Sequence, residues 1–234
     1  NQIQIRKDIR PFNSNIKTEL EFYSYSKQNY TQIIERLISS IPSDKSIFLL
    51  GRYSFDDYYL SFMYQSIKEG NRFYYVIGER KIEFLTVHKS KGLEFHTVFL
   101  PFSDWEIEKD IQQDGQPDVL WCETNEAPFN ELGTLPIPCS STVKTTVFAP
   151  DYEEEHLERR VDALNTLYVA FTRPKANLYI WGKIKELQKC KSNDNASELI
   201  YLTLRDNEND TNNEHFNCFA NLNYIRRFSV RIIG

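Results

Sequence analysis

The chain has 234 residues, a length that suits one large α/β domain or a domain with a tail rather than three or four domains. It carries 28 Lys and Arg against 33 Asp and Glu, and the net charge of −5 excludes a generally basic nucleic-acid coat protein. A small basic groove on an acidic body remains compatible with this balance. The apolar runs are far shorter than the ~20 residues of a membrane-spanning helix.

The first residues, Asn1 to Gln4, form no apolar signal region and lack an initiator Met. We therefore expect a cytoplasmic piece of a longer protein that meets no membrane. Four cysteines (Cys122, Cys139, Cys190 and Cys218) are widely spaced, with no Cys-x-x-Cys pair and no His at ligand spacing. This pattern predicts isolated reduced thiols and no metal site.

The first half of the chain alternates short apolar runs with amphipathic stretches. In chain order the pattern predicts a strand at 20–25, a helix at 30–41, a strand at 46–50, a helix at 56–68, and strands at 73–77, 82–87 and 96–102. Pro42 closes the first helix and Gly70 the second. Strands of this continuous apolar kind favour an α/β fold, with a mostly parallel sheet covered by helices on both faces.

The alternation breaks at residues 104–150, where Asp, Gln, Pro and Thr dominate. We expect an insertion there, with strand-like pieces at 119–121 and 143–148. A long helix then follows, with Asp151 as its N-cap and acidic residues in its first turn. Its apolar stripe, which predicts the core-facing side, consists of Leu157, Val161, Leu164, Tyr168 and Phe171.

The last quarter of the chain begins as ordered structure and then becomes polar. A strand is predicted at 177–182, and a helical stretch follows to about Cys190. Residues 191–234 form a polar tail, and its part at 191–217 is rich in Asn, Asp and Glu. The tail contains a helix-like island at 199–204 and a strand-like segment at 224–233 that could add to a sheet edge.

A polar turn between two predicted buried strands is the first segment that could carry chemistry. It reads Thr-Val-His-Lys-Ser-Lys-Gly-Leu-Glu-Phe over 86–95. Loops at the carboxyl ends of parallel strands are where α/β folds bind ligands. Lys89 and Lys91, together with His88 and Ser90, could hold phosphates, and Gly92 would let the backbone approach them closely. The alternative is a solvated basic turn with no ligand.

The end of the long helix is the second such segment, Asn-Thr-Leu-Tyr-Val-Ala-Phe-Thr-Arg-Pro-Lys over 165–175. It presents Arg173 at a rigid helix terminus just before a strand. Such a placement can aim a guanidinium at a phosphate. The alternative is that Arg173 and Lys175 only complement the negative end of the helix.

Taken together, the two segments resemble motifs V and VI of superfamily 1 DNA helicases of the UvrD/Rep/PcrA type. Leu-Pro-Phe-Ser-Asp-Trp (100–105) and the approach to motif VI at 161–165 look most like the AddA/RecB-type exonuclease helicases. The segment 48–57, which carries Arg52, is similar to the strand and turn that precede motif V there and in the helicase IV branch. The resemblance spans about residues 20–183, and Pro174 replaces a commoner Ala.

The resemblance implies a RecA-like domain at 1–190, with 104–150 inserted between motifs V and VI, followed by the 191–234 tail. Helicases of this type hydrolyse ATP between two RecA-like domains, and the first supplies the phosphate loop and the Mg²⁺-binding acid. This sequence has no Gly-x-x-x-x-Gly-Lys loop and no Asp-Glu pair at the end of a strand. The chain therefore resembles the second motor domain alone, and its expected partner is the N-terminal RecA-like domain of the same polypeptide.

Residue roles follow from the matched positions. Arg173 matches the motif VI arginine that reaches the γ-phosphate of ATP and acts as a catalytic arginine finger. Gly92 and Glu94 match positions that contact the nucleotide, and Arg52 matches a cofactor-binding arginine only loosely. The expected DNA-binding residues are Thr86, His88, Lys89 and Lys91.

The resulting hypothesis is the C-terminal motor domain of an ATP-dependent DNA helicase that acts on single-stranded or duplex DNA in repair or recombination. Alone, the chain should neither hydrolyse ATP nor unwind DNA. One alternative is an inert helicase-derived module that binds nucleic acid or protein. Another is a helicase that also carries a C-terminal nuclease, although the acidic residues after 190 form no evident nuclease constellation.

Overall fold

The computed structural model of the chain divides into two compact units. The first comprises residues 1–105 and 166–234, and the second comprises residues 106–165. The structure describes residues 19–24, 30–53, 56–107, 112–113, 116–183, 195–209 and 227–232.

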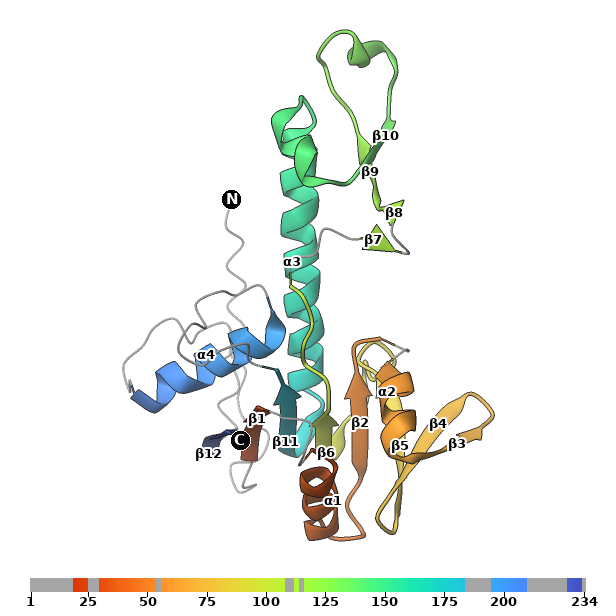
Figure 1. The fold of residues 1–234 in the computed structure, drawn as a ribbon, viewed down its shortest axis with the longest axis vertical. Helices are drawn as coiled ribbons and strands as arrows, with labels where there is room; N and C mark the ends of the chain where they lie inside the picture. The colour runs from red at the N-terminus through yellow and green to blue at the C-terminus, as the bar shows by residue number, and fades with distance from the viewer. Residues whose placement is uncertain are drawn as a thin grey trace. The chain divides into compact units, whose positions relative to one another are not determined.

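The first unit is built on an eight-stranded sheet in the order β12-β1-β11-β6-β2-β5-β4-β3 (Figure 1). The five pairings from β12 to β5 are parallel, and the two that add β4 and β3 are antiparallel. The strands are β1 (Glu19–Ser24), β2 (Ile47–Gly51), β3 (Gln65–Glu69), β4 (Arg72–Ile77), β5 (Arg80–Thr86), β6 (Phe95–Leu100), β11 (Pro174–Gly182) and β12 (Arg227–Ile232).

Helices cover both faces of this sheet, which confirms the predicted α/β fold. The helices α1 (Tyr30–Ser40) and α2 (Asp56–Met63) pack on one face, where they share a core cluster with Leu49, Phe99 and Trp181. Neighbouring residues along each strand point to the opposite face, where α4 (Ala196–Asn209) places Tyr201 against Phe22. The central strands are therefore buried on both sides and read as continuous apolar runs.

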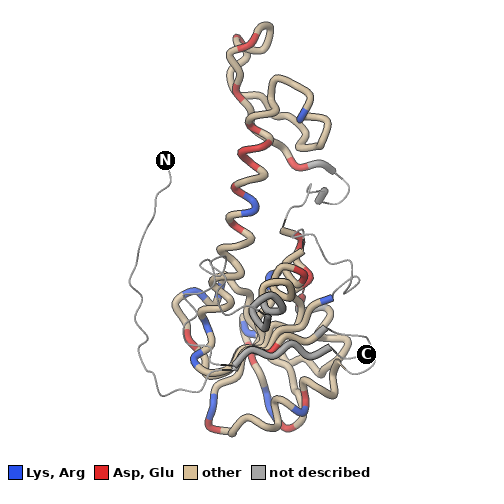
Figure 2. The backbone as a smooth tube through the Cα atoms, turned by 90° about the vertical axis from the view of Figure 1, so that its left-hand side faces the viewer, with Lys and Arg blue, Asp and Glu red and all other residues tan. Residues whose placement is uncertain are grey.

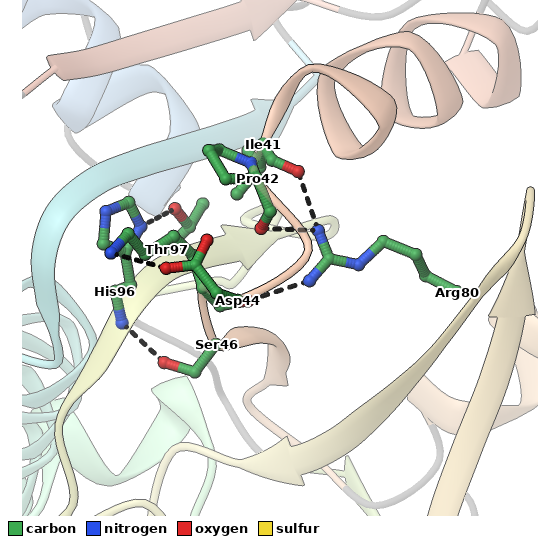
Figure 3. A network of polar contacts seen from close by, with 8 residues as sticks. Ile41, Pro42, Asp44, Ser46, Arg80, His96 and Thr97 are labelled. Atoms are coloured by element: carbon green, nitrogen blue, oxygen red, sulfur yellow. Dashed lines mark hydrogen bonds and ion pairs between the residues drawn. The ribbon is translucent and has the colours of Figure 1, made fainter.

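Arg80, at the start of β5, holds the connection between α1 and β2 (Figure 3). Its guanidinium donates to the carbonyl oxygens of Ile41 (2.9 Å), Pro42 (3.3 Å) and Lys45 (2.8 Å). These carbonyls follow the end of α1, where backbone acceptors lack helical partners and a cation is favourable. Arg80, which is distant in sequence, thus fixes the conformation of residues 41–45 just before β2.

The helix predicted at 56–68 is too long. It ends at Met63, and residues 65–69 form β3, which pairs antiparallel with β4. Gly70 has a φ of +60° and begins a two-residue hairpin turn, so it marks a strand reversal rather than a helix end. The pairing with β4 overrides the helix pattern because it supplies a full ladder of backbone hydrogen bonds.

The second unit contains a two-stranded ribbon and most of a long helix. The ribbon pairs β9 (Val119–Cys122) with β10 (Leu135–Pro138), and a shorter pair joins β7 (Gln112–Gln113) to β8 (Gln116–Pro117). The helix α3 (Ala149–Phe171) contributes its residues up to 165 to this unit. The buried core of the unit consists of Leu120, Cys122, Cys139, Val143, Phe148 and Tyr152.

The strand predicted at 143–148 is wrong, because residues 141–145 form a 3-10 helix. The hydroxyls of Thr145 and Thr146 donate to the carbonyls of Thr142 (2.9 Å) and Val143 (2.8 Å). Local bonds of this kind compete with strand pairing and favour a turn. The following helix, α3, begins at Ala149, so that Asp151 lies in its first turn rather than at its N-cap.

The predicted apolar stripe of α3 does not form its buried side. The exposed fractions of Leu157, Val161, Leu164 and Tyr168 are 60%, 48%, 40% and 51%, and of the stripe only Phe171 is buried. Besides Phe171, the buried residues between 157 and 171 are smaller on average than those of the stripe: Ala163, Thr166, Leu167 and Ala170. Both sets repeat at helical spacing, and periodicity alone does not say which of two adjoining faces packs.

The tail contributes two elements to the first unit, α4 and β12, and β12 pairs in parallel with β1 at the edge of the sheet. The helical stretch predicted between Lys183 and Cys190 lies outside the described residues. Among the helices within the described ranges, none combines the length and the apolar character needed to cross a bilayer. The proposed domain boundaries at 104, 150 and 190 stay predictions.

A first prediction concerns Gly182, at the end of β11. A Cβ atom at this position would lie 2.3 Å from Cβ of Ser197 on α4 and 2.7 Å from Oγ of Ser103. Gly182→Ala should therefore lower the free energy of unfolding by roughly 1–3 kcal/mol through overpacking. Urea denaturation measures the free energy of unfolding of this variant and of the control Ser66→Ala, a change on the exposed strand β3 that should be neutral. Equal stability of both variants would contradict the close approach of α4 to β11.

Candidate functional site: the turn at 87–94 and Arg173

The turn between β5 and β6 carries the chain across the sheet. Both strands pair in parallel with β2, which lies between them. Thr86, the last residue of β5, pairs with Gly51 at the carboxyl end of β2. Thr97 of β6 pairs with Ile47 at the amino end of β2, and Phe95 lies two residues before Thr97. Residues 87–94 must therefore pass from one end of the strands to the other, a distance of roughly 20 Å at about 3.3 Å per residue.

Backbone and hydroxyl bonds give this turn a defined shape. The amide of Val87 donates to the carbonyl of Gly51 (2.8 Å), which anchors the start of the turn to β2. The amide of Lys89 donates to Oγ1 of Thr86 (3.3 Å), and the buried Oγ of Ser90 donates to the carbonyl of Val87 (2.7 Å). The turn is thus a folded structure and not a free loop.

Gly92 takes a backbone conformation that other residues rarely adopt, with φ at +82°. A Cβ atom added there would meet nothing within 4 Å, so the constraint is conformational rather than steric. The open space beside Gly92 leaves its backbone accessible to a ligand.

Arg173 joins the end of α3 to this turn. Its Nη1 donates to the carbonyls of Leu93 (2.8 Å) and Ser90 (3.4 Å), and its Nε donates to the carbonyl of Val169 (3.0 Å). Nη2 donates to Oγ1 of Thr172 (2.9 Å). The half-buried guanidinium therefore bonds the 87–94 turn and the end of α3 at the same time.

The backbone completes the junction between the two segments. The amide of Phe95 donates to the carbonyl of Arg173 (2.9 Å), and Phe95 pairs with Pro174 at the amino ends of β6 and β11. Beside it, Nζ of Lys175 lies 2.9 Å from a carboxylate oxygen of Glu94. The hydrogen bond and charge of Lys175 lower the pKa of Glu94, so the exposed carboxyl stays ionised at neutral pH.

Arg52 does not lie with these residues. It follows Gly51 at the carboxyl end of β2, while Arg173 lies at the amino ends of the strands. The structure therefore brings Gly92, Glu94 and Arg173 together and places Arg52 at the opposite end. Thr86 is at the same end as Arg52, because it pairs with Gly51.

Aromatic rings surround Arg52, and sequence reasoning missed them. The guanidinium carbon lies 5.0 Å from the ring centroid of Tyr53 and 5.7 Å from that of Trp105. Tyr53 is 42% exposed. The signal was present in the Arg-Tyr pair after one strand and in the Trp after another, but only the parallel sheet brings these strand ends together.

The buried carboxylate of Asp56 bonds the backbone next to Arg52. Oδ2 of Asp56 accepts the amide of Tyr53 (3.0 Å), and the residue is only 6% exposed. Burial is the main cause that raises the pKa of Asp56; the backbone bonds and the charge of Arg52 act in the opposite direction. Gly51 makes room for it, since a Cβ there would lie 2.8 Å from Oδ2.

The predicted DNA-binding side chains are accessible. Thr86 is half-buried, and His88, Lys89 and Lys91 are exposed. The first unit as a whole carries 24 basic and 19 acidic residues, whereas the second carries 14 acidic and only four basic ones. The acidic balance of the chain thus comes entirely from the second unit, and the unit with the predicted DNA contacts has a net charge of +5.

A metal site finds no candidate in the described part of the chain. No group of three or more His, Cys, Asp or Glu side chains is arranged there to hold an ion. Cys122 and Cys139 are both buried in the core of the second unit, and neither forms a disulfide. Burial raises the pKa of Cys122 to about 11, so its thiol stays protonated and unreactive at neutral pH.

Arg173→Lys tests the junction itself. A lysine keeps the charge but cannot donate to four oxygens of fixed geometry, so the free energy of unfolding should fall by roughly 1–2 kcal/mol. Amide hydrogen exchange should rise within residues 88–95, where the lost carbonyl partners lie. The exposed Arg72→Lys serves as the control and should change neither quantity. Unchanged exchange at 88–95 would show that Arg173 does not hold the turn.

Asp56→Asn tests the buried carboxylate through pH. The folded pKa lies above the unfolded value of about 3.9, so ionisation is disfavoured in the folded state. The contribution of Asp56 to stability therefore falls as pH rises from the unfolded pKa through the folded pKa. Asparagine keeps an oxygen for Tyr53 without the charge, so the variant should gain stability over wild type between pH 4 and pH 7, measured by urea unfolding. The exposed Glu153→Gln should show no such trend, and a flat difference for Asp56→Asn would refute the assignment.

Known proteins resemble this chain over the stretch that carries both segments. The family model of the UvrD-like helicase C-terminal domain matches residues 60–183, a stretch that includes both the 87–94 turn and Arg173. An ATP-dependent helicase/nuclease from Streptococcus pneumoniae (strain Hungary19A-6) is 32% identical over 111 residues, or 44% of this chain. An exonuclease/helicase, RexA, from Lactococcus lactis subsp. cremoris (strain MG1363) is 31% identical over 121 residues, or 47% of this chain.

These matches cover 9% and 10% of the length of the two relatives, so the chain corresponds to a small part of each. The family model covers more than half of this chain. The mostly parallel sheet with its flanking helices is consistent with the RecA-like fold of that domain. The chain belongs to the UvrD-like helicase C-terminal domain family.

Proposed function

We propose that the chain is the second motor domain of an ATP-dependent DNA helicase that acts in repair or recombination. In this proposal ATP and Mg²⁺ are held by an N-terminal RecA-like domain of the same polypeptide, and this chain supplies Arg173. The observation that carries the proposal is the position of Arg173 against the turn that contains Gly92 and Glu94. Two sequence segments about 80 residues apart meet there.

Arg173 is suited to respond to a phosphate. In the structure its N–H groups donate to neutral carbonyls and a hydroxyl. A phosphate oxygen is a stronger acceptor, because hydrogen bonds between ionised groups are roughly twice as strong as neutral ones. Arg173 would leave part of its present set of partners and stabilise the charge that develops on the transferred phosphoryl group, which accounts for about 10³–10⁵-fold in rate in arginine-finger enzymes.

Gly92 and Glu94 would complete the nucleotide side of the site. The open backbone beside Gly92 admits a ligand, and the ionised Glu94 can accept hydrogen bonds from ribose hydroxyls. Lys175 holds that carboxylate in place at 2.9 Å. The nucleotide role of Arg52 stays a prediction, since its place at the far end of β2 separates it from these three residues.

The DNA side of the site would lie at the carboxyl ends of β2 and β5. Thr86 and His88 would contact the DNA backbone, and Lys89 and Lys91 would add positive charge. The exposed ring of Tyr53 beside Arg52 offers a surface on which a base could stack. The 87–94 turn would then couple the two sides, because a shift of Arg173 releases carbonyls of the same turn that begins at the DNA residues.

The experiment starts from the open reading frame that encodes this chain, read upstream of Asn1 for a Gly-x-x-x-x-Gly-Lys-Ser/Thr loop. The complete encoded protein is then assayed for DNA-stimulated ATP hydrolysis. Arg173→Ala should reduce turnover by about 10³-fold or more and weaken the affinity for single-stranded DNA far less. Joint replacement of Thr86 and His88 by Ala should instead weaken DNA binding with little effect on unstimulated turnover.

Arg72→Ala, an exposed change on β4, is the matched control and should behave as wild type. Robust ATP hydrolysis by the 234-residue chain alone would overturn the assignment of a half-motor. Full turnover by Arg173→Ala in the complete protein would remove Arg173 from its role. A start codon near residue 1 with no phosphate loop upstream would favour a binding module without turnover.

A further inference from the structure

The β9–β10 ribbon of the second unit has two apolar faces, and only one of them is in the core. Leu120 lies opposite Ile137 and Cys122 opposite Leu135 on the inner face, where all four join the core cluster. Because side chains alternate along a strand, the intervening residues point outward. In an ordinary ribbon with one solvated face those outward positions would be polar.

Here the outward positions are all apolar. Val119 lies opposite Pro138 and Trp121 opposite Pro136, and all four are exposed. The exposed fraction of Val119 is 50% and that of Trp121 is 67%. Leu132, in the connection between the strands, is 61% exposed. A large aromatic side chain at the centre of a small rigid apolar surface is typical of the residues that dominate protein–protein binding energy.

The prolines direct a partner to the face of the ribbon rather than to the outer edge of β10. Proline has no amide hydrogen, so the ladder bonds to β9 come from Leu135 and Ile137. Pro136 and Pro138 therefore occupy the outward edge positions, where they offer no donor to an added strand. Strand addition along the outer edge of β10 is therefore blocked, which favours contact through the side chains of the ribbon's outer face.

Charge decides which kind of partner fits. The second unit has 14 acidic and four basic residues, a net charge of −10. In Figure 2 acidic positions recur along its tube with few basic ones between them. Near the ribbon in sequence, Glu123, Glu126 and Glu131 are exposed. Such a field repels nucleic acid and anionic membranes and attracts a cationic protein surface.

We propose that the outer face of the β9–β10 ribbon, defined by Val119, Trp121, Pro136 and Pro138, is a docking surface for a protein partner. The matching partner surface would present an apolar pocket for Trp121 with Lys and Arg side chains around it. This surface is independent of the proposed motor function, because none of its residues takes part in the nucleotide or DNA contacts.

The three tryptophans of the chain allow a direct test. Trp105 and Trp181 are 5% and 0% exposed, so quenching of the 234-residue chain by acrylamide reports mainly on Trp121. The probe is a short amphipathic peptide of Leu and Lys, compared with its Leu and Glu counterpart and with oligolysine. The Leu–Lys peptide should shift the emission to the blue and protect Trp121 from the quencher, and high salt should weaken its binding. The other two peptides should leave the emission unchanged.

Variants separate docking on the ribbon from general attraction to an acidic protein. Trp121→Ser should weaken binding of a fluorescein-labelled Leu–Lys peptide at least about tenfold in anisotropy titrations. Leu157→Ser removes an equally exposed apolar side chain of α3 in the same unit and should leave the affinity unchanged. Both positions are exposed, so urea unfolding should confirm that each variant keeps wild-type stability.

Four outcomes would overturn the proposal. Equal peptide affinity of wild type and Trp121→Ser would show that the ribbon does not contribute. Self-association in sedimentation velocity that Trp121→Ser abolishes would make a second copy of the chain the occupant. A blue-shifted, quencher-resistant Trp121 in the free chain would mean that the chain itself covers the face. Protection of Trp121 by a single-stranded oligonucleotide would reassign the surface to nucleic acid.

Discussion

The contact between Arg173 and the 87–94 turn holds together the part of this domain on which its function would depend. Arg173 bonds the carbonyls of Ser90 and Leu93, and its own carbonyl accepts the amide of Phe95. One residue just beyond α3 thereby joins the start of β6 to the start of β11 and holds the shape of the turn. Any ligand that attracts the guanidinium must compete with these bonds, so ligand binding and the shape of the turn are linked.

The path of that turn would allow one short segment to contact both ligands of the proposed function. Its start is bonded to Gly51 at the carboxyl end of β2, and its end meets Arg173 at the amino end of β11. A rigid connection of this kind can pass a small displacement from one end of the sheet to the other. Charge is also divided between the units. The second unit has 14 acidic and four basic residues, and the first unit, which contains the proposed DNA-binding residues, has a net charge of +5.

Much of the fold could be predicted from local pattern. The strands at 20–25, 46–50, 73–77, 82–87 and 96–102 and the helix at 30–41 lie within a residue or two of their observed places. Two of the errors arose where two patterns were compatible with the same residues. The segment 65–69 could continue a helix or pair with β4, and α3 offered two faces at helical spacing. Tertiary contacts decided both cases, since local periodicity contains no information about which neighbour is present.

The sequence by itself determined the class of the fold and the two chemistry-bearing segments, and the resemblance of these segments to helicase motifs V and VI indicated the family. Only the tertiary structure decided that Arg173 bonds the same turn as Gly92 and Glu94, that Arg52 lies at the other end of the sheet among aromatic rings, and that Trp121 faces solvent. The reason is physical: residue types and spacing specify local structure and chemistry. Which side chains meet depends on strand order and register, which long-range pairing sets.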